Sequence, residues 1–165
     1  MKVVVEILLR PIAMHIPDGF LSISIALLCW FISLVLLICS IRQTREGLGE
    51  RQIPLMGVMA AFIFAAQMIN FPVVGGTSGH LLGGTLAAVT LGPWAGMLVM
   101  TSVIVVQGLL LQDGGLLVMG ANILNMGLLT VTVSYGLYRL VAGGSRGLRL
   151  LITGIAAWLS VMTAA

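Results

Sequence analysis

The chain has 165 residues, of which 59% are hydrophobic and 8% are charged, and its mean hydropathy is +1.16. Soluble globular domains carry charge on about a quarter of their residues and disordered chains are poor in apolar residues, so this composition excludes both classes. Residues 53–112 contain no Asp, Glu, Lys or Arg. A stretch of that length can cross lipid roughly three times at about 20 residues per helix. The sequence therefore predicts an integral membrane protein.

In chain order, the apolar segments predict about six helices, at 20–41, 53–71, 81–91, 94–111, 121–141 and 150–165. The third segment is long enough for only about 16 Å of helix, which is half a bilayer. Before it, residues 72–80 read PVVGGTSGH and are too rich in Gly and β-branched residues for a helix. Irregular backbone at membrane depth needs protein or a water-filled cavity around it. We expect an all-α membrane protein, a polytopic bundle with a re-entrant glycine-rich loop.

The basic residues indicate the orientation of this bundle. They gather in two short loops, as Arg42, Arg45 and Arg51, and as Arg139, Arg146 and Arg149. Short basic loops between apolar spans mark the cytoplasmic side, so the start of the first span and the loops 72–80 and 112–120 are expected outside. The net charge of +3 then reflects topology, and no basic stripe interleaved with aromatics suggests nucleic acid as a partner.

Both histidines of the chain, His15 and His80, fall on the predicted outer side. The plainest role for His80 is to hydrogen-bond a carbonyl and hold the loop. Two histidines that converge on one face, with few other ionisable groups nearby, favour a ligand role instead. Neutral imidazole is a common ligand for Ni, Co, Cu and Zn.

Met14 adds a more specific possibility. If the chain starts there, its free amine, the His15 main-chain nitrogen and the His15 imidazole close adjoining chelate rings, and His80 completes a planar set of four nitrogens. Such a set suits Ni(II), Cu(II) or low-spin Co(II) better than tetrahedral Zn(II). We therefore expect residues 1–13 to be an extension from a misassigned start, with processing or a start at Met1 as alternatives. Residues 14–165 would form one transmembrane domain, truncated at its C-terminus because the sixth span is short.

The remaining polar groups are expected to support this site. Asp18 in the sequence PDG indicates a turn, with direct metal contact as the alternative, and Asp113 in QDGG is likewise expected in a turn. Side chains such as Gln67 and Gln107 can hydrogen-bond between helices. The expected supporting positions are Asp18, Thr77, Ser78, Asn122 and Asn125. The two asparagines could cap a helix or hold the 72–80 loop.

Several activities lack the residues that they need. No carboxylate lies in the middle of a span, so no proton or sodium relay is evident. The only lysine is Lys2, so a Walker A loop is absent and the chain is not expected to hydrolyse ATP. Residues 76–79, GTSG, match an intramembrane serine protease around Ser78, but His80 is too close in sequence to serve as its base. A passive channel needs weaker sites than a nitrogen chelate.

The motifs MHIPDGFL, PVVGGTSGHLLGGTLAAVTLGPWAGMLVM and QDGGLLVMGANILNMG resemble the CbiM/NikM family, over most of the chain from Met14 to about Arg139. The resemblance implies the substrate-binding (S) component of an energy-coupling-factor (ECF) ABC transporter in a prokaryotic cell membrane. Its metal ligands would be Met14, His15 and His80. The sequences PDG and GGTSGH are more similar to the cobalt branch of the family, so cobalt is the expected substrate, with nickel as the alternative.

The same resemblance implies the partners. A transmembrane coupling (T) protein of CbiQ type, ATPases of CbiO type and a small CbiN-like membrane subunit would accompany the chain and drive release inward. Co(II) or Ni(II) would be the transported substrate, with no organic cofactor, and cobalt would serve cobalamin biosynthesis.

Overall fold

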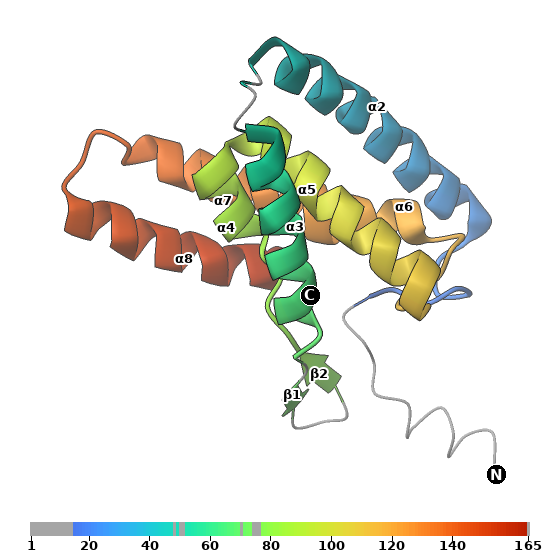
Figure 1. The fold of residues 1–165 in the computed structure, drawn as a ribbon. Coiled ribbons are helices and arrows are strands. Elements are labelled where there is room, and N and C mark those ends of the chain that lie inside the picture. Colours follow the sequence, from blue (N-terminus) through green and yellow to red (C-terminus); the bar gives the residue numbers. More distant parts are fainter. Residues whose placement is uncertain (1–14, 48, 50–51, 70, 74–76, 165) are drawn as a thin grey trace.

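The computed structural model describes residues 15–164 except 48, 50–51, 70 and 74–76. Helices dominate it, and a short strand pair lies between the second and third of them (Figure 1). The elements are α2 (Ile23–Gly47), α3 (Gln52–Gln67), β1 (Phe71–Val73), β2 (Thr77–Gly79), α4 (Gly84–Leu91), α5 (Pro93–Val106), the π-helix η1 (Gln107–Leu111), α6 (Met119–Asn122), the π-helix η2 (Ile123–Leu129), α7 (Thr130–Leu140) and α8 (Arg146–Ala164).

The all-α membrane fold predicted from the sequence is confirmed. Among the described residues, three helical stretches are long and apolar enough to cross a membrane, namely Ile23–Arg45, Pro93–Leu111 and Arg146–Ala164. A fourth continuous helical stretch, formed by α6, η2 and α7, corresponds to the predicted span 121–141. Large apolar side chains are exposed along α2 and α8, as expected for surfaces that face lipid. The chain is a multi-pass membrane protein.

Helix α5 lies at the centre of the bundle. It packs against α2, α3, α4 and η2, and its buried side chains, among them Met100 and Ile104, form much of the core. A Cβ on Gly96 would lie 3.1 Å from the main-chain carbon of Ala87 in α4. Small residues therefore allow close helix contact at this crossing, where the backbones of α4 and α5 meet.

The first helix is longer than predicted. The apolar span 20–41 continues as α2 to Gly47, through a polar stretch that we expected to be loop. Arginine is a good helix former, and Arg42 and Arg45 at the C-terminal end interact favourably with the helix dipole. A cavity of about 220 Å³ lies beside the α4–α5 turn, and the polar residues Gln43 and Gln52 are part of its lining. The C-terminal end of α2, the start of α3 and this turn therefore lie at one end of the bundle.

The glycine-rich segment combines a feature that was predicted and one that was not. Its strands β1 and β2 pair antiparallel, with Pro72 opposite Ser78, whereas the sequence predicted only a loop. Helix α4 is about 12 Å long, so the loop before it must reach into the bundle to meet its first turn. Gly83 has φ +83°, and a Cβ there would clash with Ile63 of α3. The re-entrant path therefore depends on glycine at this position.

Candidate metal centre

The segment before α2 is attached to the loop between η1 and α6. The Ile16 N–H donates to Asn122 Oδ1 at 2.8 Å, and Asn122 Nδ2 donates to the Ile16 carbonyl at 3.1 Å. The Gly115 N–H also donates to that carbonyl, at 3.0 Å. Asn122 thus pairs with the main chain beside His15, a partner that the sequence did not identify. This pairing fixes the backbone immediately after one predicted metal ligand.

His15 and His80 lie together at this end of the bundle. Their rings are stacked, with centroids 5.8 Å apart and planes 22° apart. His15 is 2% exposed, and neither of its ring nitrogens has an aligned hydrogen-bond partner among the described residues. His80 is half-buried, with Nδ1 2.9 Å from the Leu81 carbonyl. The structure therefore brings together both histidines, with His15 nitrogen atoms available for a ligand.

Asp113 completes the immediate surroundings of His15. Its Oδ1 lies 3.2 Å from His15 Nδ1. This polar contact is the main cause that lowers the pKa of Asp113 from its ordinary value, and the charges of His15 and His80 act in the same direction, against the effect of burial. The prediction that Asp113 is only a turn residue is incomplete, because its carboxylate also faces a candidate metal ligand. Its place in QDGG carried no signal of that contact.

Two glycines after Asp113 make room for these side chains. Gly114 has φ +93°, and a Cβ there would lie 2.9 Å from both His15 Cβ and Asn122 Nδ2. A Cβ on Gly115 would collide with the Asp18 carboxylate. Since non-glycine residues rarely adopt such a φ, the loop can approach the histidine only with glycine at position 114, and Gly115 leaves room for Asp18.

Asp18 lies in a turn, as its sequence predicted, but its side chain holds a different segment. Its carboxylate accepts hydrogen bonds from the N–H groups of Leu116, Leu117 and Val118 at 3.1, 3.0 and 3.3 Å. These N–H groups belong to the turn that leads into α6, so the carboxylate holds that turn. In this structure, the Asp18 oxygens are therefore committed to the loop.

The other predicted positions divide into two groups. Asn125 lies away from the histidines and donates from Nδ2 to the Ala164 carbonyl at 2.6 Å, so it attaches η2 to the end of α8. Thr77 and Ser78 lie in β2, but their side chains, like the whole of Met14 and the extension 1–13, lie outside the described residues.

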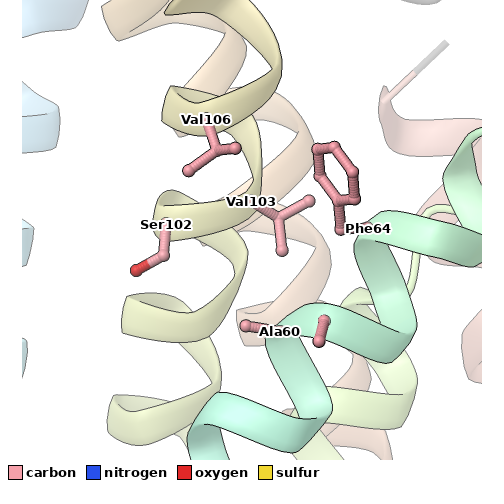
Figure 2. Close-up of a pocket in the computed structure, with 6 residues that line it drawn as sticks. Ala60, Phe64, Ser102, Val103 and Val106 are labelled. Atoms are coloured by element: carbon pink, nitrogen blue, oxygen red, sulfur yellow. The ribbon is translucent and has the colours of Figure 1, made fainter. Parts of the chain in front are cut away.

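Side chains alone do not make a complete metal site. In the described part of the chain, no three side chains of the types His, Cys, Asp and Glu are grouped closely enough to hold an ion. A cavity of about 170 Å³ between α3 and α5 is lined by Ala60, Ala61, Phe64, Ser102, Val103 and Val106 (Figure 2). None of these offers a nitrogen or carboxylate ligand.

Comparison with known proteins gives a consistent answer. The family model described as CbiM, cobalt uptake substrate-specific transmembrane region, matches residues 15–165. A metal transport protein of Haloquadratum walsbyi is 46% identical over 77% of this chain and 58% of its own length. A fused nickel transport protein, NikMN, of Archaeoglobus fulgidus is 44% identical over 92% of this chain and 50% of its own length.

A solved structure agrees in fold. The crystal structure of a truncated transition metal transporter superposes with a TM-score of 0.82 at 34% identity, covering 91% of this chain and 70% of that one. The chain spans about half the length of the curated relatives named above. With a match over nearly all of its residues, the chain belongs to the CbiM family of cobalt uptake substrate-specific transmembrane proteins.

Proposed function

We propose that the chain is the substrate-capturing membrane component of an energy-coupling-factor importer for Co(II), with Ni(II) as the alternative substrate. The observation that supports this most directly is the stacking of His15 on His80, with ring centroids 5.8 Å apart, beside a loop built from Asp113 and Gly114. The family model names cobalt, and the Archaeoglobus relative names nickel.

The proposed site uses four nitrogens. A free amine at Met14, the His15 main-chain nitrogen and His15 Nδ1 would form adjoining chelate rings, and a His80 ring nitrogen would close the plane. His15 is buried, and its ring nitrogens lack aligned partners among the described residues, so these nitrogens can serve as donors to an incoming cation. The planar set selects Ni(II), Cu(II) or low-spin Co(II) against Zn(II).

Energy would come from other subunits. The chain has one lysine, Lys2, and no Walker A sequence, so we propose that it has no ATPase activity of its own. A coupling protein of CbiQ type and ATPases of CbiO type would drive inward release. The name NikMN denotes a fused protein, which supports association of this chain with a small CbiN-like subunit.

Calorimetry on the full chain in detergent tests this function. We expect Co(II) and Ni(II) to bind with a micromolar or lower Kd, and His15→Ala and His80→Ala to abolish binding. N-terminal sequencing of the same sample shows whether Met14 carries a free amine. Unchanged binding in His80→Ala, or no binding by the unsubstituted chain when its amine is free, would contradict the proposal.

A further inference from the structure

A chain of buried amides connects the glycine-rich loop to helix α5. Gln107 Nε2 donates to Gln67 Oε1 at 2.6 Å, and Gln67 Nε2 donates to the Leu82 carbonyl at 2.6 Å. The carbonyl can only accept, so Gln67 must present its NH2 group to Leu82 and its oxygen to Gln107. Gln67 is 1% exposed and Gln107 is fully buried. Leu82 lies two residues after His80, so this amide chain ends close to the half-buried histidine.

Gln107 also reaches the other histidine through its main chain. Its carbonyl accepts the Gln112 N–H, and the Asp113 N–H at 3.3 Å. Asp113 in turn contacts His15. Gln107 begins the π-helix η1, a rare geometry that is often found at functional sites. One residue therefore connects to His80 through its side chain and to His15 through its carbonyl.

Packing alone does not account for this arrangement. Gln107 Oε1 is buried with no hydrogen-bond partner among the described residues, and an unpaired buried amide oxygen opposes folding. An unbranched apolar side chain would fill the same volume without that cost. The directional hydrogen bonds of Gln107, in contrast, fix the distance between the two segments that they connect. Apolar contacts would fix that distance less strictly.

We propose that Gln107 is a positioning residue that sets the relative placement of the His15 and His80 rings, through Gln67 and Leu82 on one side and Asp113 on the other. The inference rests on the proposed function, because the rings it positions are the proposed metal ligands. A planar chelate tolerates little error in the placement of its donors, so the fixed separation would determine how well a planar-preferring ion fits.

Gln107→Met is the most informative variant. Methionine preserves the volume and the main-chain carbonyl, so it breaks only the route to His80. The substitution removes the unpaired Gln107 Oε1 but leaves Gln67 Oε1 without its donor. These two effects oppose each other, so the melting temperature should change little. Gln107→Asn, which retains an amide too short to reach Gln67, is the second variant. Ser40→Ala is the matched control, since it removes a buried contact to Met97 Sδ at 3.3 Å in another part of the bundle.

Two measurements on the full chain in detergent separate positioning from stability. In the metal-free protein, ¹⁵N NMR of the histidine rings should show the His80 resonances shifted in Gln107→Met, with His15 less affected. Ni(II) affinity should fall about 10- to 100-fold, as for other residues that orient metal ligands. Ser40→Ala should change neither. Wild-type His80 resonances in both Gln107 variants would overturn the inference. If the unsubstituted chain binds no metal, the proposed function fails, and the NMR comparison still decides the role of Gln107.

Discussion

The carboxylate of Asp113 lies 3.2 Å from Nδ1 of His15, in the loop between η1 and α6. In the proposed chelate, Nδ1 is the imidazole atom that binds the cation, so Asp113 faces the atom on which metal capture depends. The carboxylate would thereby provide a negative charge beside a dication. This contact leads to a prediction about pH.

We expect Asp113→Asn to remove an acid-sensitive contribution to stability. The pKa of Asp113 is lowered in the folded protein from its ordinary value of 3.8. A lowered pKa means that the contribution is fully present above the ordinary value and is lost as pH falls through the folded value. Thermal unfolding in detergent should therefore show the variant less stable than the native chain near neutral pH. The two should converge in strong acid, and a difference that widened there would contradict the assignment.

Gly114→Ala should damage the site by steric means. The substitution places a Cβ 2.9 Å from His15 Cβ at a residue with φ +93°, and such strain costs about 1–3 kcal/mol. We expect a lower melting temperature and weakened Co(II) binding by calorimetry. Gly136→Ala is the control, because a Cβ at that helical position meets nothing within 4 Å and should stabilise the protein by about 0.5–1 kcal/mol. Equal effects of both substitutions would argue against a specific role for Gly114.

The sequence predicted the helices well because each depends on a local property. Runs of apolar residues and their Gly, Pro or Arg boundaries located all six segments, and the half-length of 81–91 identified the loop that bends inward. The strands β1 and β2 have three residues each, too few for an alternating pattern to be recognised. The extension of α2 through Arg42 and Arg45 was not predicted, because polar residues after an apolar span usually mark the end of a membrane helix.

The surroundings of the histidines were less predictable, because they depend on contacts between distant segments. Asn122 and Asn125 are three residues apart, yet the first holds Ile16 and the second holds Ala164. Nothing in their local sequence distinguishes these roles. Asp113 likewise acquires its partner only when the η1–α6 loop meets the segment before α2, and Gln107 only when it meets Gln67 of α3.

The two asparagines provide a direct comparison. Asn122→Ala leaves the Ile16 N–H and carbonyl without their side-chain partner, and a buried unsatisfied group costs about 1–3 kcal/mol. We expect this variant to bind Co(II) more weakly, because the backbone that follows His15 is released. Asn125→Ala removes only the bond to Ala164, so it should lower stability without changing affinity. Calorimetry and thermal unfolding on both variants test this, and a loss of affinity in Asn125→Ala alone would reverse the assignment.

Asp18→Ala distinguishes a loop support from a metal ligand. The carboxylate accepts three main-chain N–H groups before α6, and one hydrogen bond contributes about 1 kcal/mol to stability. We expect a lower melting temperature, with the visible absorption spectrum of bound Ni(II) unchanged in band position, because the donor atoms around the ion remain the same. Asp18→Asn retains one acceptor oxygen and should fall between the two in stability. A shifted Ni(II) spectrum in both variants would instead place Asp18 in the coordination of the metal.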